Sequence, residues 1–249
     1  MPASTRSSHD EHIAFDAVVR RSVVQYGKSL GLVVPFAVLA VFTVLFEANV
    51  DLVSELVDVQ IGLGGVSVTT DGPADTLFGT VPDGVAWFFL LGVAMNLALV
   101  VLFGMFAVCC ALIATADAEA GRSRPLDALI GRASRRLPAM VSTAFLASLL
   151  VVVGLLAFVL PGLYLLWRLA FALPAAAIDG AGPTAAIRAS WTSSAGRFVP
   201  IAGVLVAATA ALLVASAIPF VEEFLVTIVV LPIVSIALGV RYLEATEVS

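Results

Sequence analysis

The chain has 249 residues, of which 61% are hydrophobic and only 12% are charged, and its mean hydropathy is +1.08. Soluble domains are about half apolar and about a quarter charged, so this composition excludes an ordinary soluble domain and predicts a protein of the lipid bilayer. The formal net charge of −5 argues against a nucleic-acid partner.

Apolar segments long enough to cross a membrane recur along the chain. A spanning helix needs roughly 20 apolar residues to cross the hydrocarbon core. The segments predicted to span, in chain order, are 30–46, 85–116, 139–160, 162–178, 199–217 and 224–240. The predicted fold class is therefore an all-α, multi-pass bundle of about six transmembrane helices with short interfacial helices.

The third and fourth spans come from one apolar stretch of residues, 139–178, whose only charge is Arg168. As a helix this stretch would reach about twice across a bilayer. Proline breaks the helix behind it and glycine permits a tight reversal. Pro161 and Gly162 therefore predict the turn of a helical hairpin.

Positive charges predict the orientation, because Lys and Arg collect in short cytoplasmic loops. With six spans, twelve of the thirteen Lys and Arg residues fall on one side and Arg168 lies in the membrane. We therefore predict a cell-membrane protein with both termini in the cytoplasm. The expected parts are a cytoplasmic N-terminal segment 1–28, whose interfacial helix covers about 13–29, and a six-span domain 29–249 with outer loop 47–84 and inner loops 117–138 and 179–198.

The loops carry local signals of their own. The outer loop begins with an amphipathic pattern over 51–59 and continues with strand-like alternation over 61–70. The inner segment 179–198 reads as a short interfacial helix between two breaks. Because Trp and Tyr favour membrane interfaces, we place Tyr164 and Trp167 near the outer boundary and Trp191 near the inner one.

Small residues recur every four positions along the fifth predicted helix. Such a stripe lets a second helix approach closely in lipid, so we expect a contact with another helix of this chain, with a second copy, or with a membrane protein partner. The residues are Gly203, Ala207, Ala211 and Ala215.

Two polar residues inside the spans are candidates for a function. Arg168 is an intramembrane cation, and such groups mark functional sites by default; alternatively, it snorkels outward or pairs with Glu222 or Glu223. Asn96 forms either a hydrogen bond between helices or a substrate contact. The sequence predicts no catalytic constellation, no metal site and no cofactor.

The segment 160–198 resembles the membrane domain of glycerophosphoryl diester phosphodiesterases and related uncharacterised haloarchaeal six-helix membrane proteins. The shared features are the Pro161-Gly162-Leu163-Tyr164 turn, the arginine that follows it, an acidic residue, and an Ala-x-x-x-Ser-Trp helix. The resemblance implies a membrane module without the hydrolase. It also implies that Arg168, Asp179, Arg188, Ser190 and Trp191 form one structural unit.

Two functions of different classes follow. The first is a non-enzymatic membrane module that organises partners or lipids, as the small-residue stripe and the absence of a catalytic pattern indicate. The second is a small transporter or permease subunit, which Arg168, Asn96 and the proline-broken helices would suit.

Overall fold

The protein is a helical membrane bundle, with six helical segments that are long and apolar enough to cross a bilayer in the described part of the chain. The computed structural model describes residues 17–26, 30–56, 58–62, 65–69, 83–122, 124–217 and 222–247. The six segments are Gly31–Asp51, Leu90–Glu119, Leu126–Ala157, Val159–Asp179, Phe198–Ala215 and Glu222–Glu247. The predicted fold class and the number of spans are confirmed.

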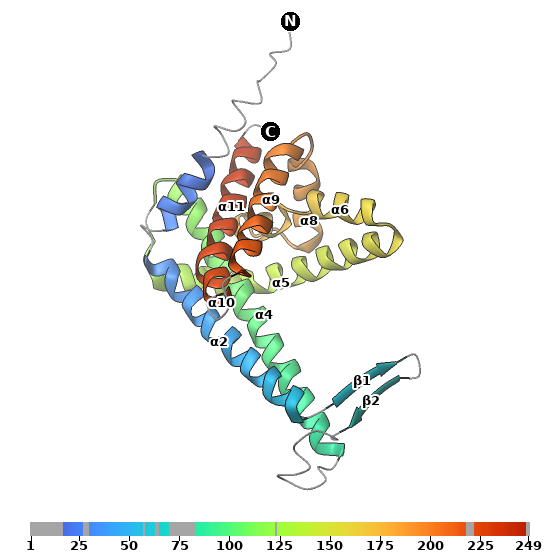
Figure 1. The fold of residues 1–249 in the computed structure, drawn as a ribbon. Coiled ribbons are helices and arrows are strands. Elements are labelled where there is room, and N and C mark those ends of the chain that lie inside the picture. Colours follow the sequence, from blue (N-terminus) through green and yellow to red (C-terminus); the bar gives the residue numbers. More distant parts are fainter. Residues whose placement is uncertain are drawn as a thin grey trace, which may run out of the picture. The chain divides into compact units, whose positions relative to one another are not determined.

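The chain divides into two compact units, and residues 38–104 form the smaller one. Helix α2 (Leu30–Leu56) leads into a hairpin of β1 (Asp58–Gly62) and β2 (Gly65–Thr69), and α4 (Asp83–Glu119) follows (Figure 1). The strands are antiparallel, with Asp58 opposite Thr69. The strand-like alternation predicted over 61–70 is thus confirmed. The amphipathic helix expected there is a continuation of α2, since residues 47–56 contain neither proline nor glycine.

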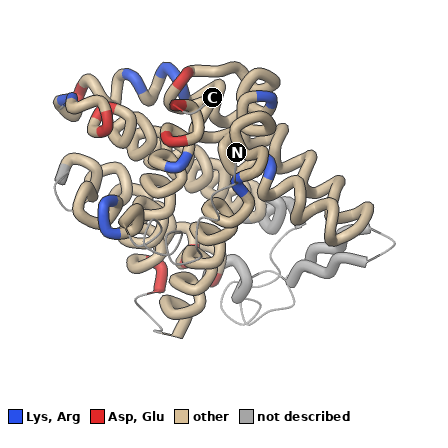
Figure 2. The backbone as a smooth tube through the Cα atoms, turned by 90° about the horizontal axis from the view of Figure 1, so that it is seen from above, with Lys and Arg blue, Asp and Glu red and all other residues tan. Residues whose placement is uncertain are grey.

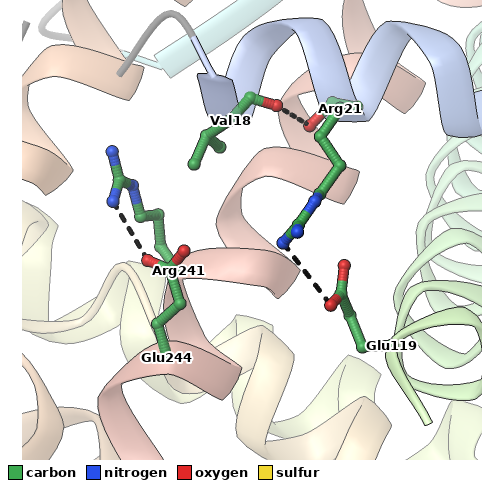
Figure 3. Close-up of polar contacts among 6 residues, drawn as sticks. Val18, Arg21, Glu119, Arg241 and Glu244 are labelled. Carbon is green, nitrogen blue, oxygen red and sulfur yellow. Dashed lines mark hydrogen bonds and ion pairs between the residues drawn. The ribbon is translucent and has the colours of Figure 1, made fainter. Parts of the chain in front are cut away.

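The larger unit comprises residues 1–37 and 105–249. Its first described element is a helix over 17–26, in which the buried Ser22 hydroxyl donates to the carbonyl of Val18 at 2.9 Å. Arg21 of this helix lies 3.6 Å from the carboxylate of Glu119 at the end of α4 (Figure 3). Part of the predicted interfacial helix is therefore present and is joined to the bundle.

Helices α5 (Leu126–Ala157) and α6 (Val159–Arg168) form the predicted helical hairpin. The reversal lies at Phe158, whose backbone is extended (φ −164°, ψ 151°), and not at Pro161-Gly162. Pro161 falls in the first turn of α6, where its missing N–H removes no helical hydrogen bond. Gly162 faces Leu155 of α5 so closely that an added Cβ would lie 2.4 Å from its side chain. Pro161 thus lies in the first turn of α6, and Gly162 allows α6 to pack closely on α5.

The fourth span continues beyond α6 through a break into α7 (Ala172–Pro174) and the π-helix η1 (Ala175–Asp179). Gly180 then adopts a left-handed conformation, with φ of +71°. Helix α8 (Pro183–Ser193) follows and packs against α5, α7 and η1. The helix predicted within 179–198 exists, but it folds back along the fourth span and buries Ala186 and Ser190.

The C-terminal hairpin consists of α9 (Phe198–Ala215), α10 (Glu222–Phe224), the π-helix η2 (Leu225–Val230) and α11 (Leu231–Glu247). Pro232 has no N–H to donate to the carbonyl of Ile228 one turn earlier. The phenol of Tyr26 donates to that carbonyl instead, at 2.6 Å. The proline thereby creates the acceptor that ties the N-terminal helix to the last span.

The small-residue stripe of α9 is partly covered by this chain. Helix α9 packs on η2 and α11; Gly203, Ala207 and Ala211 are half-buried and Ala215 is buried. The opposite face, with Val206 and Leu213, is exposed. An intramolecular contact is therefore present, and an oligomer through this stripe stays a prediction.

Candidate functional site

Arg168, at the end of α6, lies in a cluster of polar and aromatic groups contributed by α6 and α8. Its Nε donates to the hydroxyl of Tyr164 at 3.0 Å, and its Nη1 donates to the carbonyl of Trp191 at 3.0 Å and to the Ser194 hydroxyl at 3.4 Å. The guanidinium carbon lies 4.6 Å from the centre of the Trp191 ring, with the rings of Tyr164 and Trp167 at 5.6 and 5.4 Å. We call these five residues the arginine cage.

Two serines of the segment 179–198 also contact the backbone where α6 ends. The Ser190 hydroxyl donates to the carbonyl of Arg168 at 2.7 Å and accepts from the N–H of Phe171 at 3.1 Å. The Ser194 hydroxyl lies 3.2 Å from the same Arg168 carbonyl. Both serines are buried. A helix break leaves backbone groups without helical partners, and these hydroxyls bond to them inside the bundle.

The arginine cage corrects two predictions made from sequence. In the described part of the chain Arg168 bonds to Tyr164, Trp191 and Ser194, and neither Glu222 nor Glu223 is its partner. The rings of Tyr164 and Trp191 are 5.9 Å apart, so Tyr164 and Trp191 cannot lie at opposite interfaces separated by about 30 Å of hydrocarbon. The assignment failed because α8 turns back along the fourth span, which span counting does not detect.

A second polar cluster surrounds Asp179, where η1 ends. The Tyr242 hydroxyl of α11 donates to the Asp179 carboxylate. Arg136 of α5 donates through Nη1 to the carbonyls of Ala177 and Ile178, at 2.9 and 2.7 Å. A cation here satisfies carbonyls at the negative end of the helix. The cluster thus joins α5, η1 and α11.

Gly180 makes room for the Arg136 side chain. Its φ of +71° disfavours any residue with a side chain. A Cβ at this position would also lie 2.8 Å from Nη1 of Arg136. Both requirements explain the Asp179-Gly180 pair that begins the inner segment.

The candidate residues are therefore only partly brought together. Arg168 and Trp191 meet in the arginine cage, and Ser190 bonds to the backbone carbonyl of Arg168 beside it. Asp179 lies in the second cluster with Arg136 and Tyr242. Arg188 is exposed on α8, and its side chain joins neither group. Sequence reasoning missed Arg136 and Tyr242, because their only sequence signal is an arginine before Pro138 and a tyrosine in the last span.

Asn96 belongs to the smaller unit, where it lies in α4. It lines an apolar groove of about 370 Å³ with Phe42 and Leu45 of α2 and Phe88 and Gly92 of α4. Its side-chain oxygen is buried and has no hydrogen-bond partner among the residues that the structure describes. The predicted hydrogen bond between helices is therefore not made within that part of the chain.

No family model, curated protein or solved structure matches the chain. The resemblance to the phosphodiesterase membrane domain accordingly stays a prediction.

Proposed function

We propose that this protein is a non-enzymatic, multi-pass module of the cell membrane that organises lipids or partner proteins. The observation that carries the proposal is the state of Arg168. A cation that binds a transported substrate needs donors directed into a passage, whereas the Nε and Nη1 of Arg168 bond to groups of α6 and α8 and its plane is flanked by rings. Arg168 therefore serves to join helices.

The α5–α6 hairpin supports contact with lipid. Its tip presents large apolar side chains outward, with Leu156 83% exposed and Phe158 77% exposed. Apolar surface of this size is unfavourable in water and is expected either in the hydrocarbon core or against another membrane protein. The hairpin is thus the part of the larger unit best suited to lipid or partner contact.

The orientation belongs to the same proposal. Twelve of the thirteen cationic residues fall on one side of a six-span arrangement, which supports cytoplasmic termini. Figure 2 shows that charged residues occupy few positions along the helices. The arrangement would place the arginines of α5 and α8 beside the cytoplasmic leaflet.

Crosslinking in native membranes, followed by mass spectrometry of the purified chain with its bound lipids, tests the proposal. We expect one protein or lipid species to be enriched over the bulk membrane. A Leu156→Ala, Phe158→Ala variant should lose part of this enrichment, while Val206→Ala on the exposed face of α9 should not. Recovery of monomer without any enriched protein or lipid would contradict the proposal.

A small transporter or permease subunit is the second candidate, and one observation favours it. The side-chain oxygen of Asn96 is buried without a partner beside an otherwise apolar groove, and a polar group of this kind inside a span is a candidate substrate contact. Reconstituted vesicles separate the two functions: solute flux that Asn96→Leu abolishes without loss of folding would establish transport. The same substitution leaves lipid or partner enrichment unchanged if the module proposal is right.

A further inference from the structure

The first third of α5 borders a hollow of about 640 Å³. All of its lining residues lie within 124–136, so the hollow is open to the outside along one side of this stretch. The hollow is lined by Arg124, Asp127, Gly131, Arg132, Arg135 and Arg136, together with one alanine. A Cβ added at Gly131 would meet no atom within 4 Å, so this glycine leaves the space open.

Three of these arginines share one face of α5. Positions 132, 135 and 136 are separated by three and four residues, which places their side chains side by side. Like charges at this spacing destabilise a helix when no anion is near. The arrangement is therefore unfavourable by itself and becomes favourable when an anion binds.

Internal anions neutralise this face only in part, because Asp117 attracts Arg132 and Asp179 attracts Arg136 without forming a close ion pair with either. Arg124 is already paired, because its Nε and Nη2 lie 2.6 and 2.9 Å from the two carboxylate oxygens of Asp117. This hydrogen bond raises the pKa of Arg124. Arg132 and Arg135 form no ion pair with any residue that the structure describes. Asp127 is the one carboxylate in the lining.

Arg136 is positioned for an additional ligand. Its Nη1 bonds to two carbonyls of η1, which are uncharged and leave its positive charge in place. Gly180 permits this approach, and the resulting contact holds the guanidinium against the end of η1. The charge is thus fixed at the wall of the hollow, whereas Arg135 is exposed and can move toward a ligand.

We propose that Arg132, Arg135 and Arg136 bind the phosphate group of an anionic ligand, either a lipid headgroup or free phosphate. Planar guanidinium groups match phosphate oxygens with paired hydrogen bonds. Basic pockets beside membrane helices on the cytoplasmic side are suited to anionic headgroups. The inference rests on the proposed function, which it narrows to one ligand class.

The test uses the full chain in detergent and compares phosphatidylglycerol with phosphatidylcholine of the same acyl chains, by native mass spectrometry or fluorescence titration. Wild-type protein should bind phosphatidylglycerol more tightly by roughly tenfold or more, the equivalent of one charge-assisted hydrogen bond. Arg135→Gln should remove most of this preference, since Arg135 is exposed and its loss should not disturb folding. Arg188→Gln, at an exposed arginine outside the hollow, is the matched control and should retain the preference.

Two further measurements show whether the ligand is a lipid headgroup or free phosphate, and whether net charge alone explains the binding. Arg135→Lys keeps the charge but loses the paired hydrogen bonds, so binding should fall between that of wild type and Arg135→Gln. Displacement of the lipid by inorganic phosphate would indicate that phosphate alone suffices, whereas tight lipid binding without displacement would indicate a headgroup site. Equal losses in Arg135→Gln and Arg188→Gln, or no preference in wild type, would overturn the inference. The wider proposal would survive either result if a neutral lipid or a protein were enriched in native membranes.

Discussion

Replacing Gly162 with alanine tests whether close packing between α5 and α6 holds the hairpin together. The added Cβ would lie 2.4 Å from Cγ and Cδ2 of Leu155 and 2.8 Å from its Cα. Rotating the leucine can relieve the first two contacts but not the third, because the Cα belongs to the backbone. Helix α6 must therefore move away from α5 by up to about an ångström to restore ordinary separations of roughly 3.5–4.0 Å.

The expected change in the free energy of unfolding follows from two opposing effects. Overpacking a well-packed interface costs about 1–3 kcal/mol, and alanine regains roughly 1 kcal/mol of helix propensity over glycine. We expect Gly162→Ala to lower the free energy of unfolding by about 1 kcal/mol in total, within a range of roughly 0–2 kcal/mol. The control is Gly131→Ala in α5, where a Cβ meets nothing within 4 Å and the propensity gain of about 0.5–1 kcal/mol should appear alone.

Unfolding in mixed micelles, followed by circular dichroism, measures both variants under one condition. The two substitutions should shift the midpoint in opposite directions. A stabilising Gly162→Ala would refute the reasoning, because it would mean that α5 and α6 are not in contact as closely as the structure places them.

Three further predictions follow from the polar contacts. Arg168→Lys should destabilise the protein by about 1–3 kcal/mol, since an ammonium cannot make the same set of bonds to Tyr164, Trp191 and Ser194; an unchanged midpoint in the same unfolding assay would argue that the arginine cage contributes nothing. Tyr26→Phe should cost about 1 kcal/mol by leaving the Ile228 carbonyl unpaired. Burial raises the pKa of this phenol above its ordinary value of 10.0. The stability that the phenol contributes is therefore present below about pH 10 and is lost as the pH rises through the folded-state pKa. If the stability of Tyr26→Phe fell by the same amount at alkaline pH, the phenol would not be the cause. For orientation, a cysteine at Ser67 should react with an impermeant thiol reagent added outside, and one at the exposed Thr192 should react only after the membrane is opened; Cys109 and Cys110 are fully buried and should add little background.

The candidate clusters were harder to predict than the spans. The helix within 179–198 could be predicted from its proline start and the glycines at both ends, whereas the grouping of Ser190 and Trp191 with Arg168 was implied only by the family resemblance. The partners of this segment could not be predicted. Arg136 lies more than forty positions before the Ile178 carbonyl that it binds, and Tyr242 lies more than sixty after Asp179. Pairings across such distances leave no periodic trace in one sequence.

The sequence by itself determined the solvent, the fold class and the number of spans, because a helix must be long and apolar enough to satisfy its backbone within lipid, and length and composition are local properties. Only the tertiary structure decided where the chain reverses and what Arg168 binds. Pro161 and Gly162 are compatible with a turn or with a tightly packed helix start, and it is the proximity of Leu155 in α5 that selects the second. Arg168 could reach water, a carboxylate or a carbonyl, and the folding back of α8 places the carbonyl and the ring of Trp191 within its reach.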